Sequence, residues 1–354
     1  MKIKEPRRPI LACLGLAVAF LLVSERVRAQ ADFYKGKNIT IIQGRQPGGT
    51  GDMRVRAVIP FLRKYIPGSP MIASEYMPGG GGRKAANHIY HSARPDGLNI
   101  GNVGTGLVAN AVLGETGVQY DLEKLIYLGS PYSSYHALFL SRREVGLHSL
   151  EKLRDASGIR VGAHAVGSAT YLEGRLFARI VGLKEPRFIT AYSGPELDVA
   201  IVRGEIDARS SSTDTVMRRN RDWVERNLMD FHVIFEVPKG EKHPHFAHLP
   251  ELETFARSDM ERKLLVLQRA FKIAGAPFIL PPRTPADKVK ILQEAMRRTF
   301  NDPEFHKEFK KLTGEDSTPL MPEALDKVVR ELPRDAGIIE LFKKIAGPGP
   351  LPPY

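Results

Sequence analysis

Pro47-Gly48-Gly49-Thr50-Gly51-Asp52 and Pro78-Gly79-Gly80-Gly81-Gly82-Arg83-Lys84 are the two stretches that decide how this chain folds. The apolar run Ile39–Ile42 precedes the first stretch, the run Met71–Ala73 leads towards the second, and a segment with helical periodicity follows each. Glycine allows the backbone to turn its N–H groups towards a ligand, and a helix that begins there adds unpaired donors and the positive end of its dipole. Such loops bind anions, so the pair predicts a site for a small anionic molecule.

Short apolar runs alternate with helical segments along the rest of the chain, which is typical of α/β layers. Strands are expected at Leu98–Val103, Ala137–Leu140, Arg160–Gly162, Phe188–Thr190, Ile206–Ala208 and Phe231–Val237. A polar loop is expected over Ser210–Thr213, and Thr284-Pro285 is expected to supply the N-cap and the first residue of a helix. The Pro- and Gly-rich end, Gly347–Tyr354, carries no packing signal.

Residues 1–31 predict a secretory signal peptide. Lys2–Arg8 is basic, Ile10–Val23 is apolar, and Ala29-Gln30-Ala31 supplies small residues at the spacing that a signal peptidase cuts. The apolar run is short for a membrane span, so an uncleaved anchor is the less favoured alternative. The protein is therefore expected in the periplasm. The one cysteine, Cys13, lies in this segment, so the mature chain is expected to lack disulfides, thiolate nucleophiles and cysteine metal sites.

The charge balance favours small anionic partners. The formal net charge is +12, and the signal region carries six basic and two acidic residues, which leaves about +8 on the mature chain. A basic balance favours encounter with anions. Because the protein is expected to be exported, nucleic acid is not the expected partner and a small anionic solute fits better.

Several enzyme and cofactor motifs are absent or incomplete. No Gly-x-Ser-x-Gly elbow occurs, which argues against an α/β-hydrolase. Gly79–Lys84 resembles a P-loop, but Ala85 stands where a magnesium-binding hydroxyl is required. Gly104-x-Gly106-x-x-Ala109 is a weak dinucleotide fingerprint. Two histidine groups could bind a metal, but no acidic residue completes a set, so no metal or cofactor is expected; these groups are His88 with His91, and His243 with His245 and His248.

The chain resembles the solute receptors of tripartite tricarboxylate transporters, the Bug family of periplasmic binding proteins, over nearly all of its mature length. The resemblance lies in the order and spacing of a set of motifs: Phe33–Thr40 leading to Pro47-Gly48-Gly49 and Asp52, Met77–Gly82, Ala93–Gly97, Gly167–Thr170 opening a helix, and Tyr192–Glu196 with Gly204–Asp207 behind it.

The resemblance implies an α/β, two-lobed, Venus-flytrap fold of periplasmic-binding-protein type II, each lobe a mixed sheet flanked by helices. Lobe 1 is expected to comprise residues 32–134 and 239–354, and lobe 2 residues 135–238, with crossings near Tyr132–Tyr135 and Val237–Lys239. It further implies a cleft that holds a small organic acid, a mono-, di- or tricarboxylate, with one carboxylate held by the first two loops partly through bridging waters. The receptor then docks on membrane permease subunits, and a monomer is expected.

No catalytic residue is expected, and the predicted ligand-binding residues are Gly48, Gly49, Thr50, Asp52, Gly80, Gly81, Arg83, Ser168, Thr170, Tyr192 and Ser211. Each has a plainer alternative: the glycines as turn residues, Asp52 and Ser168 as helix caps, Thr170 as an ordinary helix residue, Tyr192 as interlobe packing, and the charged residues as solvated side chains. If the ligand carries a second acidic group, Arg83 is the expected partner, because its fork can pair with a carboxylate bidentately and Lys84 cannot.

The chain departs from the family's pattern in ways that leave the ligand's identity open. Gln43-Gly44-Arg45-Gln46 replaces the usual apolar, proline-rich lead, and Gly51 looks inserted before Asp52. Ser211 and Ser212 stand where amino-acid-binding relatives tend to carry an acid. Two other functions remain open: a secreted hydrolase that acts on a carboxylated substrate in the same cleft, and a sensory receptor that serves a membrane kinase.

Overall fold

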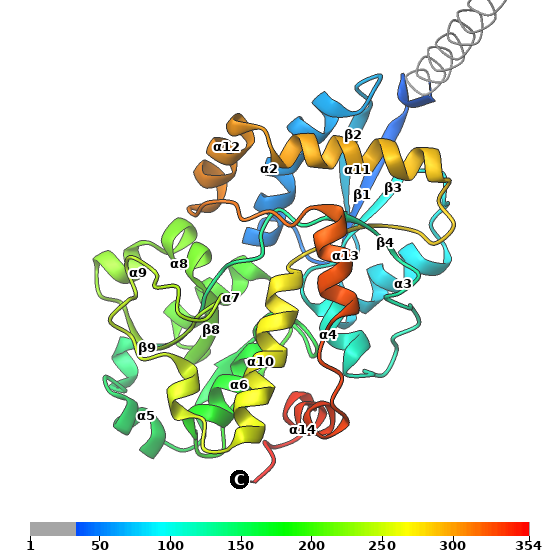
Figure 1. The fold of residues 1–354 in the computed structure, drawn as a ribbon. Helices are drawn as coiled ribbons and strands as arrows, with labels where there is room; N and C mark the ends of the chain where they lie inside the picture. The colour runs from blue at the N-terminus through cyan, green and yellow to red at the C-terminus, as the bar shows by residue number, and fades with distance from the viewer. Residues whose placement is uncertain (1–32, 354) are drawn as a thin grey trace, which may run out of the picture.

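The computed structural model describes residues 33–353, so the predicted signal peptide lies outside the described residues. Within this range no helix combines the length and the apolar character that a bilayer crossing requires. Figure 1 shows two groups of strands, each covered by helices, which are called here the first lobe (blue to cyan, with the orange helices) and the second lobe (green).

The first lobe contains a five-stranded mixed sheet in the order β2-β1-β3-β10-β4. Its strands are β1 (Asn38–Gln43), β2 (Met71–Tyr76), β3 (Asn99–Asn102), β4 (Ile126–Gly129) and β10 (Phe278–Leu280). β1 runs parallel to β2 and β3, whereas β10 runs antiparallel to β3 and β4. β10 is therefore a strand that comes from far along the chain to complete this sheet.

The second lobe contains a five-stranded mixed sheet in the order β7-β6-β8-β5-β9. Its strands are β5 (Ala137–Arg142), β6 (Arg160–Gly162), β7 (Arg187–Ile189), β8 (Ala208–Ser212) and β9 (Met229–Phe235). β6 runs parallel to β7 and β8, and β5 runs antiparallel to β8 and β9. Two mixed sheets, each flanked by helices, confirm the predicted architecture.

Helices cover both sheets and connect the lobes. The helices are α2 (Thr50–Tyr65), α3 (Arg83–His91), α4 (Gly106–Val112), α5 (Leu150–Asp155), α6 (Ala169–Val181), α7 (Gly194–Arg203), α8 (Thr213–Arg219), α9 (Asp222–Glu225), α10 (Asp259–Ala274), α11 (Ala286–Phe300), α12 (Pro303–Thr313), α13 (Pro322–Arg330) and α14 (Ala336–Ala346), with short 3₁₀ turns at Gly80–Gly82, Arg143–Val145 and Leu252–Phe255. α11 and α12 pack on α2, and α14 packs on α6.

The described chain passes between the two sheets twice. It leaves the first sheet after β4, reaches β5 of the second sheet through a segment that includes the expected crossing at Tyr132–Tyr135, and returns between β9 and β10. α10 lies in the return segment, and its Leu265 and Phe271 belong to a hydrophobic cluster that contains Leu107 of the first lobe and Phe177 of the second. The two lobes therefore share part of their core. The lobe boundaries expected from the sequence stay a prediction.

Both glycine stretches open helices, as predicted: α2 begins at Thr50 and α3 at Arg83. Two further local predictions, by contrast, are wrong. Ser210–Ser212 is part of β8 rather than a loop, because pairing with Ala137–Phe139 of β5 satisfies its backbone. Pro285 is the N-cap of α11 rather than its first residue, since its backbone is not helical.

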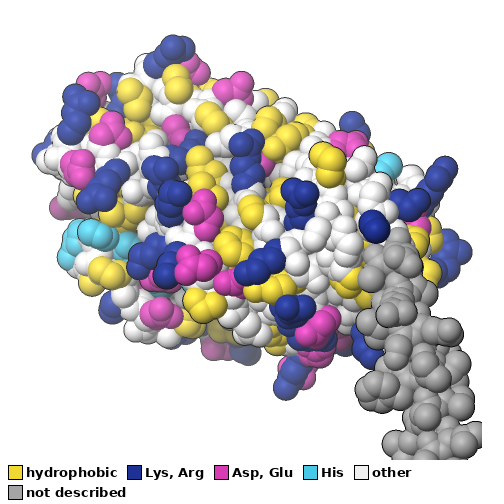
Figure 2. All heavy atoms as spheres, turned by 90° about the horizontal axis from the view of Figure 1, so that it is seen from above, with side chains coloured by type: hydrophobic (Ala, Val, Ile, Leu, Met, Phe, Trp, Pro, Cys, Tyr) yellow, Lys and Arg dark blue, Asp and Glu magenta, His cyan; other side chains and the backbone are white. Residues whose placement is uncertain are grey.

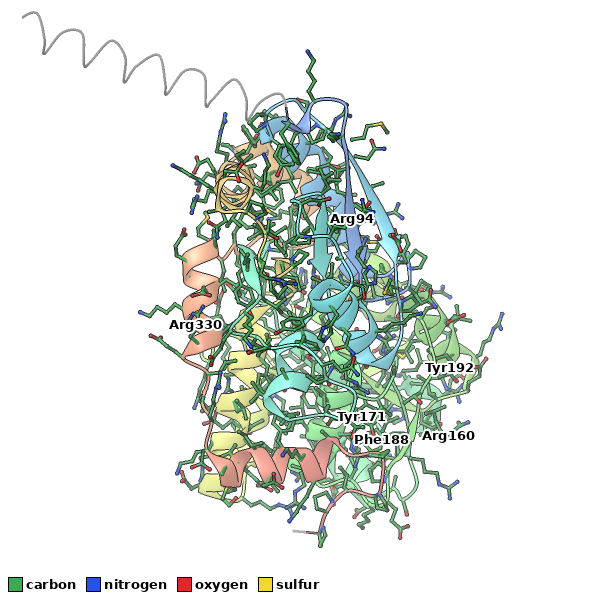
Figure 3. All side chains as sticks on the ribbon, turned by 90° about the vertical axis from the view of Figure 1, so that its right-hand side faces the viewer. Arg94, Arg160, Tyr171, Phe188, Tyr192 and Arg330 are labelled. Atoms are coloured by element: carbon green, nitrogen blue, oxygen red, sulfur yellow. The ribbon has the colours of Figure 1, made fainter. Side chains whose placement is uncertain are left out.

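The C-terminal tail also departs from expectation, because it packs on α6. The hydroxyl of Tyr171 donates to the carbonyl of Gly347 at 2.9 Å, Arg175 donates to Gly349 at 2.8 Å and Arg179 donates to Pro352 at 2.7 Å. In Figure 3, Tyr171 lies with Phe188 close to the end of α14, and their rings are 5.9 Å apart. The tail lacks apolar side chains of helical spacing, but its carbonyls serve as acceptors for donors on α6.

Candidate functional site

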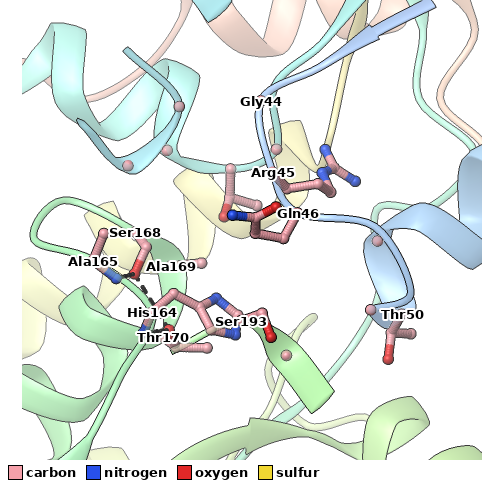
Figure 4. A pocket seen from close by; sticks show the side chains of 18 of the residues that line it. Gly44, Arg45, Gln46, Thr50, His164, Ala165, Ser168, Ala169, Thr170 and Ser193 are labelled. Atoms are coloured by element: carbon pink, nitrogen blue, oxygen red, sulfur yellow. Dashed lines mark hydrogen bonds between the residues drawn. The ribbon is translucent and has the colours of Figure 1, made fainter. Parts of the chain in front are cut away.

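A cavity of about 370 Å³ lies between the two lobes. The first lobe contributes the turn after β1, the beginning of α2, the glycine turn before α3 and the turn after β3. The second lobe contributes the beginning of α6, the turn before α7, the end of β8 and the end of α8. Figure 4 shows side chains of both lobes around this space, with Arg45 on the first-lobe side and His164 on the second-lobe side.

Arg45 lies on the first-lobe wall of the cavity, directly after β1. Its Nη2 donates to the side chain of Asn102 at 2.6 Å and to that residue's carbonyl at 3.2 Å. Among the described residues no acidic side chain forms a salt bridge with it. Asp52 attracts it only from beyond salt-bridge distance, and burial, the largest influence, lowers the pKa of Arg45. At neutral pH this guanidinium is still charged.

The beginning of α2 adjoins Arg45 and carries the first glycine stretch. Its N-cap, Gly49, has an extended backbone and no side chain to cap the helix, and its carbonyl accepts from Asp52 and Met53. The N–H groups of Thr50 and Gly51, the first two of the helix, are therefore available to an anion in the cavity.

Asp52 anchors this loop on the side that faces away from the cavity. It is fully buried and accepts hydrogen bonds from the Gly48 N–H at 3.0 Å, from Gln43 at 2.9 Å and from Tyr76 at 2.8 Å. Burial by itself would raise the pKa of Asp52, but these three donors and the Arg56 charge outweigh it and hold that pKa below its ordinary value. Asp52 is thus a charged anchor for the loop and does not line the cavity.

On the second-lobe wall two hydroxyls stabilise the start of α6. The Ser168 side chain caps the helix by accepting from the Tyr171 N–H at 3.3 Å, and the Thr170 hydroxyl accepts from the His164 N–H at 3.2 Å. Both residues line the cavity. Their local bonds fix the turn that presents His164, as Figure 4 shows.

Two polar groups of this wall have no hydrogen-bond partner in the described structure: His164 Nε2 and the Ser211 hydroxyl. Ser211 is 1% exposed and lies near the end of β8. Burial lowers the pKa of His164 to about 3, and Arg209, Arg219 and Arg45 lower it further through their charges. The imidazole is therefore neutral at physiological pH. A buried polar atom without a partner costs free energy, so a ligand that meets both groups would relieve that cost.

The other cations of the lining, and Glu173, are paired with opposite charges, while the Glu196 carboxylate accepts from the Ser193 N–H at 2.7 Å. Arg54 pairs with Asp214, and its guanidinium lies 3.7 Å from the centre of the Tyr132 ring. Arg209 and Arg219 share the two oxygens of Asp198. Glu173 accepts from Lys272 at 2.7 Å. These buried pairs leave Arg45 as the cation of the described lining that lacks an acidic partner.

Two direct contacts cross the cleft from α2 to α8. The Thr50 and Thr215 hydroxyls are 2.8 Å apart, and Arg54 forms its salt bridge with Asp214. The structure therefore has its lobes closed upon each other at this end of the cavity.

The structure brings seven of the eleven predicted ligand-binding residues to the cavity wall, and these are Gly49, Thr50, Gly81, Ser168, Thr170, Tyr192 and Ser211. Tyr192 lies towards the outer edge of the second lobe in Figure 3, and its hydroxyl is 3.4 Å from Glu205. The other four, Gly48, Asp52, Gly80 and Arg83, lie outside the lining. Arg83 is half-buried and donates to Asn110 at 3.3 Å.

Sequence reasoning did not select several residues of the lining, which are Arg54, Thr105, Tyr132, Tyr135, His164, Arg209, Thr215 and Arg219. For Tyr132 and Tyr135 the sequence predicted only a crossing between the lobes, not a place in the lining. Arg209 carried a weak signal, since an arginine inside a buried strand usually has a specific partner. Arg54 and Arg219 lie on helices, where a charged residue ordinarily indicates a solvated face.

Among the described residues, neither a metal-binding group nor a hydrogen-bonded serine–histidine pair lies in the cavity. The described residues contain no group of three side chains placed to hold a metal ion. Ser141 and His232 are 2.8 Å apart, but both are buried in the second sheet and neither lines the cavity. The charges of the outer surface do not indicate another site on the face in Figure 2, because basic side chains there are interspersed with acidic ones.

Comparison of the sequence with models of protein families and with curated proteins finds no match. Comparison with solved structures does. The periplasmic binding protein BugD superposes with a TM-score of 0.69 at 17% identity, covering 88% of this chain and 98% of that chain. MatC of Rhodopseudomonas palustris, solved with bound malate, gives 0.66 at 19% identity, with coverage of 88% and 99%.

A second R. palustris protein, solved with adipate, gives a TM-score of 0.65 at 16% identity, covering 88% of this chain and 97% of that chain. At these identities the likeness is one of fold. Together with the two mixed sheets and the cavity between them, it shows that the chain has the two-lobed fold of the type II periplasmic binding proteins.

Proposed function

We propose that this protein is an extracytoplasmic solute receptor of the tripartite tricarboxylate transporter type, which captures a small organic carboxylate between its lobes and delivers it to a membrane permease. The observation that carries the proposal is the positive wall of the cavity. Arg45 has no acidic partner among the described residues, and the uncapped beginning of α2 lies beside it. Two positive features side by side favour the binding of an anion, and a carboxylate on the ligand would supply it.

The solved structures of like fold support the ligand class. MatC was solved with malate and another R. palustris protein with adipate, both small carboxylates. The motif set of the Bug family, including the two glycine stretches, supports the same assignment. Export to the periplasm, a monomeric state and docking on permease subunits belong to this proposal.

The hydrolase alternative is not favoured by the lining. A general base should titrate near the working pH, but the pKa of His164 is lowered to about 3. The Ser168 and Thr170 hydroxyls already accept from main-chain N–H groups, and His164 Nε2 contacts neither of them. A sensory receptor would use the same binding chemistry and differ only in its membrane partner.

Titration calorimetry of the mature protein against mono-, di- and tricarboxylates, neutral sugars and cationic amino acids tests the proposal. At least one carboxylate should bind, and at a hundredfold excess over its dissociation constant it should add about 2.7 kcal/mol to the free energy of unfolding. The bound acid should be recovered unchanged when followed by NMR. Binding of sugars or cations alone would contradict the proposal, and turnover of the acid would favour the hydrolase.

A further inference from the structure

The Arg45 guanidinium lies next to two glycines, Gly51 and Gly104, in a space that is called here the Arg45 seat. A Cβ added to Gly51 would come within 2.4 Å of Arg45 Nη1, and one added to Gly104 would come within 3.4 Å of Nη2. Gly51 is the second residue of α2, and its backbone is in an ordinary helical region. Helix conformation therefore does not require glycine at this position. The missing side chain leaves room for Arg45 at the beginning of the helix.

That seat is electrostatically unfavourable in the absence of an anion. A cation beside the N-terminus of a helix meets the positive end of the dipole. Asn102 supplies neutral acceptors for Arg45, and Asp52 attracts it from beyond salt-bridge distance, but none of the described acids forms a salt bridge with it. The seat therefore suits an anionic group that contacts Arg45 and the first N–H groups of α2 together.

The salt bridges around the cavity leave one cation without an acidic partner. The cations that line the cavity or pair with its lining are Arg45, Arg54, Arg209, Arg219 and Lys272; Arg54 pairs with Asp214, Arg209 and Arg219 share Asp198, and Lys272 pairs with Glu173. Arg45 is the one cation of this set without a salt bridge to a described acid. A second buried carboxylate would have to compete with an acid already in place, at a cost in desolvation.

The unpartnered groups on the opposite wall are neutral. They are the Ser211 hydroxyl and the His164 imidazole, which has one donor and one acceptor nitrogen. Such groups match an uncharged hydrogen-bonding function on a ligand.

We propose that Arg45 is the specificity-determining residue of this cleft, pairing with a single carboxylate of the ligand, and that the ligand's other end is an uncharged hydroxyl, carbonyl or amide that meets Ser211 and His164. This inference rests on the proposed function and specifies its ligand class. In this proposal Arg45, rather than Arg83, is the arginine that pairs with a carboxylate of the ligand.

Protein variants test the role of Arg45. Arg45→Gln should weaken binding of the preferred acid roughly 10- to 150-fold, the range for a charge-assisted hydrogen bond in a closed site. The control Arg94→Gln removes an exposed arginine of the same lobe that lies outside the cavity, and should leave affinity unchanged. Equal affinities for the two variants would overturn the role of Arg45.

Gly51→Ala tests the same role without removing the arginine. The added methyl group should displace the guanidinium and weaken binding on the order of tenfold, while the melting temperature stays equal or rises because alanine favours a helix. Gly337→Ala, at the second position of α14 and outside the cavity, is the matched control. If Arg45→Gln fails to fold, this pair still decides: unchanged affinity in Gly51→Ala would overturn the proposal.

Matched ligands test the neutral end. Succinamate, succinate and butyrate differ only in whether an amide, a carboxylate or a methyl group stands opposite the first carboxylate, and longer homologues extend the series. The amide acid should bind at least tenfold more tightly than the dicarboxylate, and Ser211→Ala should reduce the advantage of the amide acid over the unsubstituted acid. A dicarboxylate that binds as tightly as its amide would overturn the neutral end. If the wild-type protein binds no carboxylate of any series, the proposed function itself fails.

Discussion

The two glycine stretches of the first lobe have similar composition but different positions relative to the cavity. In the first, Gly49 is the N-cap of α2, and its extended backbone leaves the beginning of that helix at the cavity wall. In the second, all four glycines from Gly79 to Gly82 have positive φ angles. Gly81 there lies so close to Gly167 of the second lobe that its Cβ would meet that carbonyl carbon at 2.6 Å. The first stretch presents donors, and the second allows two backbones to meet.

The difference shows that glycine content alone does not identify an anion site. In the first stretch the anchor is Asp52, whose side chain binds the loop on the side away from the cavity and leaves the cavity side of the loop free. In the second stretch the backbone turns so far that Arg83 emerges beside Asn110, away from the lining. Under the proposed function, the same local chemistry serves recognition in one loop and close packing in the other.

The largest expected effect tests the packing role of the second stretch. Gly81→Ala should lower the free energy of unfolding by about 1–3 kcal/mol because its φ is +62°, and the overlap with Gly167 should add about 1–3 kcal/mol. Urea unfolding measures this change, and calorimetry should show weaker ligand binding because the lobes cannot approach. Gly146→Ala shares the positive φ but has no atom within 4 Å, so an equal loss there would refute the packing role.

An intermediate effect tests the anchor of the first stretch. Asp52→Asn should cost about 1.5–3 kcal/mol at neutral pH, because it weakens hydrogen bonds to a buried charge. Since the folded-state pKa of Asp52 is lowered, its contribution is present above its unfolded value of 3.8 and is lost as the pH falls through the folded pKa.

The difference in unfolding free energy between the wild type and Asp52→Asn should therefore shrink as urea titrations move from pH 7 to below pH 4. Asp155→Asn, which removes an exposed carboxylate, serves as the control. A difference that stays constant over this pH range would show that the Asp52 charge does not anchor the loop.

The smallest expected effect concerns the charges that follow the second stretch. Arg83→Gln should change the free energy of unfolding by no more than about 1 kcal/mol, because the arginine makes one long, partly exposed hydrogen bond. Affinity for mono- and dicarboxylates should stay within about twofold of the wild type, as for the exposed Lys84→Gln. A selective loss of dicarboxylate binding in Arg83→Gln would restore the sequence-based hypothesis and erase the contrast between the two stretches.

Local sequence signals predicted a large part of the fold. The strand at Arg160–Gly162 and the helix starts at Thr50 and Arg83 follow from apolar runs and glycines within a few residues of each other. β4 and β10 were not predicted, because they pair with each other across a long stretch of sequence, which local periodicity cannot indicate.

By itself, the sequence determined the α/β layers, the two glycine turns, the helices that follow them and most of the small and hydroxyl residues around the cavity. Only the tertiary structure decided which charges matter. Arg54 meets Asp214 across 160 positions of sequence, and Arg45 is left without an acidic partner because its neighbours are Asn102, Gly51 and Gly104. Whether a charge is buried, paired or open to a ligand depends on elements that meet only after folding, so spacing along the chain cannot indicate it.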